Sequence, residues 1–157
     1  MAADAGGQWF ALVDAAADER LFALLRRSRS AECLFSGELA PEFAAAAPYL
    51  VAHDPREPLF ETWTKEGGGH NWGLFCRSAM PFDALRRHFK KLLNVRLPDG
   101  DVVLFRFWDP RVFNPFVRGC TEVERAALFG GVSDYLVEGE GGHRHAYSCP
   151  GGLLQIR

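Results

Sequence analysis

Two histidines and a cysteine near the C-terminus are the first residues whose types could support chemistry. His143 and His145 are separated by one residue, and Cys149 follows four residues after the second histidine. Imidazole nitrogen and thiolate sulfur are common zinc ligands. The spacing matches no common zinc module and no fourth ligand is evident, so we expect a solvated Gly-rich loop and no bound metal.

A glycine run at residues 67–69 could suggest a phosphate cradle. A P-loop needs Lys followed by Ser or Thr directly after its glycines, at the start of a helix. Here the sequence continues as His70-Asn71-Trp72-Gly73, and the next element has the pattern of a strand. Glycine tolerates positive φ, so we expect a tight turn and no bound nucleotide or other cofactor.

Four cysteines, at positions 33, 76, 120 and 149, lie far apart and form no C-x-x-C pair. We expect buried or half-buried thiols of a reducing compartment. Cys76 or Cys120 with a histidine base would be the candidates for a nucleophile. Neither is surrounded by a nucleophile elbow or an oxyanion turn. The sequence therefore favours a protein that is not an enzyme, and a small hydrolase with a Cys/His pair stays the alternative.

A basic amphipathic helix is expected from Pro81 onward, because proline suits the first helical turn. Its apolar positions share one arc of the helical wheel. We expect Leu85, Phe89 and Leu92 to be buried. The opposite arc is basic and comprises Arg86, Arg87, Lys90 and Lys91. This arc is either a solvated face or a docking surface for an acidic partner, since clustered cations steer association.

Arg106, Asp109 and Arg111 form a second charged set. Arg106 interrupts the apolar run 102–108, which we expect to be a central strand covered on both faces. A buried charge must be paired, and an Arg–Asp–Arg cluster at the strand end would satisfy this need. We therefore expect a structural role for the cluster, with a partner contact as the second interpretation.

The remaining pattern alternates strands and helices. Strands are expected at 9–15, 31–36, 49–53, 71–76, 94–97, 102–108, 135–137 and 153–156, and helices at 18–27, 42–47, 59–65, 111–117 and 122–129, the last with Thr121 as N-cap. Pro98-Asp99-Gly100 predicts a hairpin turn. This order predicts an α/β fold, a single compact domain with a mixed β-sheet flanked by helices.

Composition excludes several classes of protein. The formal net charge of the 157 residues is −2, without the basic excess of a nucleic-acid binder. No apolar run approaches the roughly 18 residues that span a bilayer, and the N-terminus has no pattern of a signal peptide. We therefore expect a cytoplasmic protein that binds neither nucleic acid nor membrane.

Several segments together resemble the effector adaptors, or effector chaperones, of bacterial type VI secretion. These adaptors, of the Tap and Tec type, form a family long known only as a domain of unknown function. The resembling segments are APYLV at 47–51, WGLF at 72–75, LRRHFKKLLNVRLPDG at 85–100, LFRFWDPRV at 104–112, Cys120-Thr121 and Phe129-Gly130. The family-like region spans about 9–137 of a single adaptor domain at 1–157, and residues 138–157 form a Gly-rich extension. Trp108 stands where we expect tyrosine, and many relatives carry a further C-terminal lobe that this chain is expected to lack.

The resemblance implies a function without catalysis. Such adaptors bind a toxic effector polypeptide and help to load it onto the VgrG-type spike protein before the machine fires. The partners implied are therefore the effector and the spike, and a structural subunit of the machine is the other alternative. Arg86, Arg87, Lys90, Lys91 and Trp72 are the candidate partner-binding residues.

Overall fold

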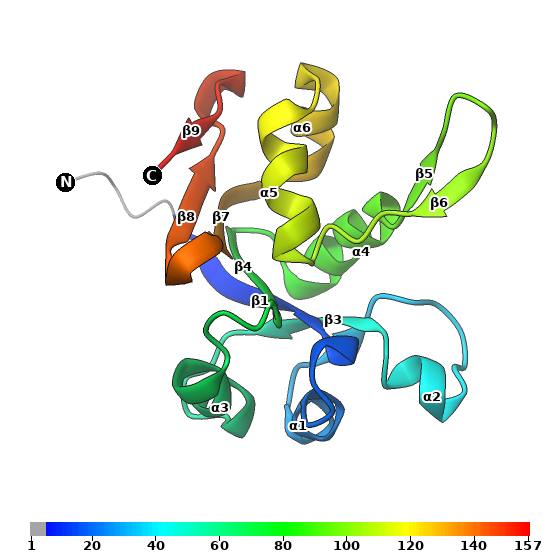
Figure 1. Cartoon of the computed structure of the whole chain (residues 1–157), viewed down its shortest axis with the longest axis vertical. Helices are drawn as coiled ribbons and strands as arrows, with labels where there is room; N and C mark the ends of the chain where they lie inside the picture. The colour runs from blue at the N-terminus through cyan, green and yellow to red at the C-terminus, as the bar shows by residue number, and fades with distance from the viewer. Residues whose placement is uncertain (1–5) are drawn as a thin grey trace.

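One twisted sheet runs through the part of the chain that the computed structural model describes, residues 6–157 (Figure 1). Its strand order is β2-β3-β1-β4-β7-β8-β9, and every pair is antiparallel. The strands are β1 (Gln8–Asp14), β2 (Glu32–Cys33), β3 (Pro48–Ala52), β4 (Gly73–Ser78), β7 (Val132–Glu138), β8 (Arg144–Ser148) and β9 (Gln155–Ile156). The expected α/β fold, a sheet flanked by helices, is confirmed.

Strand β1 is an inner strand of the sheet, with β3 on one side and β4 on the other. Its alternate side chains enter two separate hydrophobic cores. Phe10 and Leu12 belong to the first core, and Ala11 and Val13 to the second. This period-2 division is what a strand covered on both faces requires.

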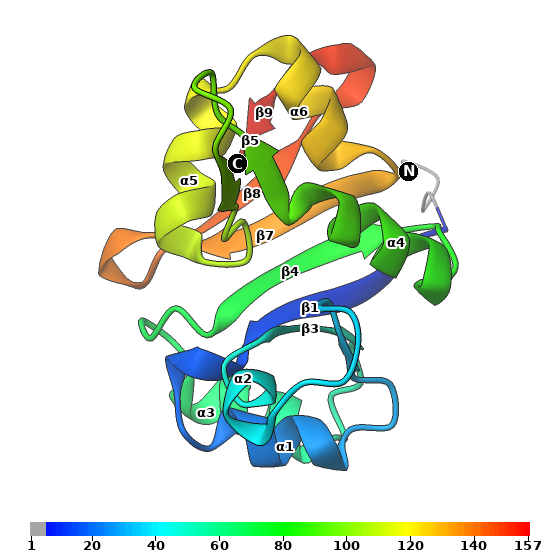
Figure 2. The same ribbon diagram turned by 90° about the vertical axis from the view of Figure 1, so that its right-hand side faces the viewer.

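Three helices cover the first face of the sheet: α4 (Phe82–Leu92), α5 (Pro110–Gly119) and α6 (Glu122–Phe129). Figure 2 shows α4 in front of β1 and β4, with α5 and α6 beside β7 and β8. Each helix contributes fully or largely buried side chains to the first core, namely Leu85, Phe89, Phe113, Val117, Leu128 and Phe129. This face is covered from β3 to β8.

The second face is covered by α1 (Leu21–Arg27) and α3 (Pro58–Glu66), with the short α2 (Pro41–Ala44) nearby. Their core side chains are Leu21, Leu25, Leu59, Phe60 and Trp63. In Figure 2 these helices gather at the β3 end of the sheet, while β8 and β9 lie at the other end. No residue of β7, β8 or β9 belongs to the buried part of this second core within residues 6–157. Half of the second face is therefore bare.

The expected cap of α6 is confirmed. The Thr121 hydroxyl accepts a hydrogen bond from the Glu124 amide at 3.1 Å, and the Glu124 carboxylate accepts one from the Thr121 amide at 3.0 Å. This reciprocal pair is a capping box, which satisfies two amides that have no partner inside the helix. The helix ends at Phe129, and its C-cap, Gly130, has a φ of 50°.

The hairpin is confirmed, but the central strand expected at 102–108 is wrong. Strands β5 (Asn94–Arg96) and β6 (Val102–Leu104) pair only with each other and project from the body. Strand β6 ends at Leu104, and the chain then turns inward, where Phe107 and Trp108 are buried. A continuous apolar run has no period, so exposed and buried parts of it could not be separated by pattern.

The Gly-rich segment 138–157 is an integral part of the sheet. Strand β8 was missed in the sequence, because one large apolar side chain among small or polar neighbours gives little pattern. That side chain, Tyr147, is fully buried, and its ring lies 5.7 Å from that of Phe113. Strand β9 follows beside β8.

Candidate interaction surfaces

The basic helix α4 presents only part of its cationic arc to solvent. Leu85 and Phe89 are fully buried as expected, whereas Leu92 is half-buried. Arg87 and Lys91 are exposed, and Lys90 is half-buried. The half-buried guanidinium of Arg86 donates two hydrogen bonds to the Cys33 carbonyl oxygen, at 3.1 and 2.7 Å. Arg86 therefore ties α4 to β2.

Trp72, a candidate contact residue from the sequence, is 1% exposed. Its ring meets the ring of Trp63 edge-on at 6.2 Å, and the Arg20 guanidinium lies 5.5 Å from its centre. The Trp72 side chain therefore packs in the core between α3 and the start of β4. It offers no surface to a partner, which corrects the expectation.

The charged set Arg106, Asp109 and Arg111 includes a fourth member, Asp14, at the end of β1. Arg106 donates to the Asp14 carboxylate at 3.0 Å, and Arg111 donates to Asp109 at 3.0 and 2.8 Å. The Arg106 side chain is 47% exposed, so it reaches Asp14 from the surface. Asp14 was missed because its contact spans 92 positions of sequence, although an acid that ends an apolar strand was visible.

The two carboxylates of this cluster are perturbed in opposite directions. Burial raises the pKa of Asp14, against the opposing effect of the Ala16 amide and Arg106. Burial also acts to raise the pKa of Asp109, but the hydrogen bonds from Arg111 outweigh it and lower that pKa. Asp109 also accepts from the Arg111 amide at 2.9 Å and caps α5. The cluster thus fixes local structure at the junction of β1 and α5.

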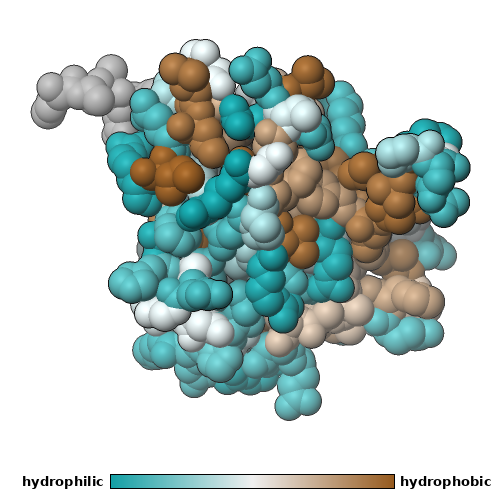
Figure 3. Space-filling model, turned by 45° about the horizontal axis from the view of Figure 1, so that its top comes forward, coloured by the Kyte–Doolittle hydropathy of each residue, from teal (hydrophilic) through white to brown (hydrophobic). Residues whose placement is uncertain are grey.

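The β5–β6 hairpin exposes an apolar surface. Figure 3 shows hydrophobic side chains gathered on the part that projects at the right, where the hairpin lies in Figure 1. Between 38% and 56% of each side chain is exposed for Val95, Leu97, Val102, Val103 and Leu104. The register pairs Val95 with Val103 on one face of the hairpin, and Val102 and Leu104 lie on the other, so both faces carry apolar groups. Its sheet contains no third strand among the described residues.

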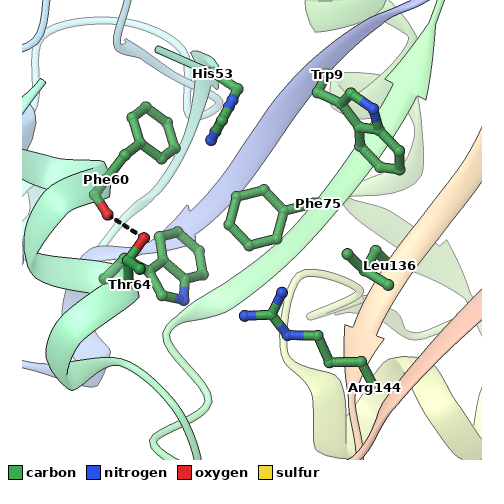
Figure 4. Close-up of a pocket in the computed structure, with 8 residues that line it drawn as sticks. Trp9, His53, Phe60, Thr64, Phe75, Leu136 and Arg144 are labelled. Atoms are coloured by element: carbon green, nitrogen blue, oxygen red, sulfur yellow. Dashed lines mark hydrogen bonds between the residues drawn. The ribbon is translucent and has the colours of Figure 1, made fainter. Parts of the chain in front are cut away.

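A second surface is an aromatic pocket on the bare half of the sheet's second face (Figure 4). Its volume is about 270 Å³. Phe75 of β4 and Leu136 of β7, which are register partners, form the floor. The walls come from α3, β1, β8 and the residue after β3, and comprise Phe60, Trp63, Thr64, Trp9, Arg144 and His53.

The glycine loop before β4 is a structural turn. Asn71 has a φ of 53°, and its amide and that of Gly69 both donate to the Glu138 carboxylate. A Cβ at Gly73 would lie 1.8 Å from the Leu12 carbonyl oxygen, which only glycine avoids. The loop therefore ties β4 to β1 and β7, as expected for a tight turn.

The residues considered as metal ligands or as cysteine nucleophiles do not form an assembled site in the part of the chain that the structure describes. Within residues 6–157 no three His, Cys, Asp or Glu side chains converge as metal ligands. Burial raises the pKa of the Cys76 thiol, and burial also raises that of Cys120. Cys120 donates its weak hydrogen bond to the Val117 carbonyl oxygen. Raised thiol pKa values are the reverse of what an activated cysteine needs.

Among the helices of residues 6–157, none has both the length and the apolar character that crossing a bilayer requires. No curated protein and no solved structure matches the chain. One family model does match, and it extends from residue 9 to residue 127, from β1 through most of α6. It covers the second hydrophobic core, part of the first, the charged cluster and the hairpin. The chain therefore belongs to the family described as Domain of unknown function (DUF4123).

Proposed function

We propose that this chain is a non-catalytic adaptor that binds a type VI secretion effector and helps to load it onto a VgrG-type spike protein in the bacterial cytoplasm. The segments that resemble the effector adaptors supply the identity of the partners. The observation that carries a binding role is the apolar hairpin, which no other strand of the described chain covers.

An isolated two-stranded hairpin is at best marginally stable in water. This one has two open edges and exposed valine and leucine side chains on both faces. Contiguous exposed apolar groups mark interaction sites in soluble proteins, and open strand edges can pair with another chain. A protein partner that buries the hairpin would remove both liabilities.

The ionisable groups support a role without catalysis. Asp14, Asp109 and Glu138 hold backbone amides, and Asp14 and Asp109 also bind arginines. The pKa of His88 is lowered by burial, and its ring contacts the Leu128 carbonyl oxygen at 3.2 Å. These side chains stabilise turns, caps and packing. A catalytic site needs such groups to converge on a substrate instead.

Deletion of the gene tests the proposal in a bacterium that secretes effectors through this machine. We expect delivery of the cognate effector to stop while secretion of the tube protein continues. Loss of all secretion, tube protein included, would indicate a structural subunit. Normal delivery together with hydrolysis of a substrate by the purified chain would refute the adaptor function.

The hairpin itself is tested by a double variant, Val102→Ser with Leu104→Ser. Both side chains are exposed, so folding should be retained while co-purification with the effector or the spike is weakened. Asp101→Ser, at the polar tip of the same hairpin, is the matched control and should bind as the unchanged chain does. Equal binding by all three proteins would remove the hairpin from the interface.

A further inference from the structure

The aromatic pocket on the bare half of the sheet has walls that are held in place before anything binds. The Phe75 ring lies 4.7 Å from the Trp63 ring and 5.9 Å from the His53 ring, and His53 meets Phe60 edge-on at 4.6 Å. The Thr64 hydroxyl donates to the Phe60 carbonyl oxygen at 2.8 Å, as the dashed line in Figure 4 shows. Walls fixed in this way lose little freedom on binding, which favours affinity.

The size of the pocket limits its occupant. A cavity of about 270 Å³ lies just below the range of roughly 300–1,000 Å³ that is usual for small-molecule and cofactor sites. A smaller hollow of about 110 Å³ adjoins it and shares Trp63, Phe75, Leu136 and Arg144. The two together form a groove over β4 and β7. One large side chain fits the larger part, and the chain that carries it can continue along the groove.

The charge of the lining limits the occupant further. Arg144 is exposed, and Figure 4 shows its guanidinium directed over the pocket towards Phe75. Within residues 6–157 this guanidinium has no hydrogen-bonding or ion-pair partner. None of the eight lining residues is acidic. Glu138, the acid that lines the adjoining hollow, already accepts hydrogen bonds from two backbone amides. A carboxylate on the occupant would therefore complement Arg144.

From this geometry we infer that the pocket binds a segment of a partner protein that inserts one large apolar side chain and places a neighbouring carboxylate on Arg144. The inference rests on the proposed function in one respect, which is that the occupant is a polypeptide. Aromatic side chains and arginine in preformed pockets are typical centres of binding energy at interfaces. The pocket would thus anchor one partner of the adaptor, on the opposite face of the sheet from α4.

The test selects peptides from a random display library on the full chain. We expect enrichment of sequences with Trp, Phe or Leu within two positions of Asp or Glu. The selected peptide is then synthesised, and its dissociation constant is measured by titration calorimetry. Enrichment of sequences that lack the acid, or no enrichment at all, would overturn the inference.

Two variants locate the bound peptide. Arg144→Gln should weaken binding about tenfold, the effect of losing a charge-assisted hydrogen bond. Thr64→Trp should fill the pocket from α3 and abolish binding, while its circular dichroism spectrum stays native. Arg87→Gln makes the same change of charge on the exposed face of α4 and should bind the peptide unchanged. Equal affinity of all the variants for the peptide would overturn the inference.

The outcomes for the pocket and for the proposed function are separable. Suppose that effector delivery depends on the gene while Arg144→Gln and Thr64→Trp leave the affinity for the selected peptides unchanged. In that case the pocket inference fails and the adaptor function stands. If both variants weaken peptide binding as expected while deletion of the gene leaves effector delivery unchanged, the pocket binds as inferred and the proposed function fails.

Discussion

The two faces of the sheet are built from alternate residues of the same strands but are covered to different extents. On the first face, α4, α5 and α6 bury side chains from β3 to β8. On the second face, α1 and α3 cover the β3 and β1 half, and the surface over β7 and β8 stays open. Phe75 lies at this boundary, half-buried against α3 and lining the pocket.

The difference shows how one fold separates stability from recognition. The covered face contains Phe89, Phe107, Phe113 and Tyr135, all fully buried. The open face exposes Trp9, whose ring lies 5.8 Å from the Arg77 guanidinium, beside Arg144 and Leu136. Large apolar groups left partly in water favour binding, because a partner can still bury them. The open half-face is therefore the part of the sheet available for contact.

The largest expected effect contrasts the two faces directly. Phe89→Ala on the covered face should lower the free energy of unfolding by about 3–5 kcal/mol, because it leaves a cavity in the core. Trp9→Ala on the open face should lower it by less, because 36% of that residue is already in water. Urea unfolding of both variants measures the difference. Equal losses of unfolding free energy would mean that Trp9 contributes to the core as much as Phe89 does.

A smaller effect is expected at the end of β1, where Arg106 meets Asp14. Arg106→Ala should cost about 1–3 kcal/mol at neutral pH, because the buried carboxylate loses its charged partner. Burial already raises the pKa of Asp14. In acid the carboxyl group is protonated and needs the arginine less, so the cost should shrink as the pH falls. Urea titrations across a pH series would contradict this account if the cost were constant.

The two carboxylates of the cluster should respond to pH with opposite signs. The pKa of Asp109 is lowered, so its contribution is present above the ordinary value of 3.8 and is lost as the pH falls through its folded-state pKa. Asp109→Asn should therefore cost about 1 kcal/mol at neutral pH and less in acid. The pKa of Asp14 is raised, so the unchanged protein loses stability as the pH rises through this range. The free energy of unfolding of Asp14→Asn should therefore rise relative to that of the unchanged protein as the pH rises through the same range.

Measured pH profiles of the two asparagine variants check this prediction. Each variant is the control for the other, because both lose one carboxylate of the same cluster. Slopes of the same sign would show that the two acids titrate in similar surroundings.

The smallest effect on stability is expected on the outer surface of α4. Arg87→Glu with Lys91→Glu should change the free energy of unfolding by less than about 0.5 kcal/mol, because both side chains are exposed. If this surface contacts an acidic partner, association should slow, and more so at low salt. Arg86→Ala is a useful contrast, because Arg86 is bonded to the Cys33 carbonyl oxygen and should affect stability more. If the variant associates with its partner at the same rate as the unchanged protein at low salt, the basic arc of α4 is a solvated face.

The sequence by itself determined the elements with a clear period or cap. The wheel of α4 placed Leu85 and Phe89 inside, and Thr121 predicted the start of α6. The Pro98-Asp99-Gly100 turn predicted the hairpin. These features depend on residues within a few positions of one another, so local physics decides them. The α/β class follows from their order.

Tertiary structure alone decided which surfaces are free. Trp72 is buried because α3 packs over it, and Val102–Leu104 is exposed on a hairpin with which no third strand of the described chain pairs. Asp14 finds Arg106 across 92 positions, and the pocket combines residues of α3, β1, β4, β7 and β8. An apolar run has the same sequence pattern whether a neighbour covers it or not. Burial depends on where distant segments come to lie, and only the folded chain fixes that.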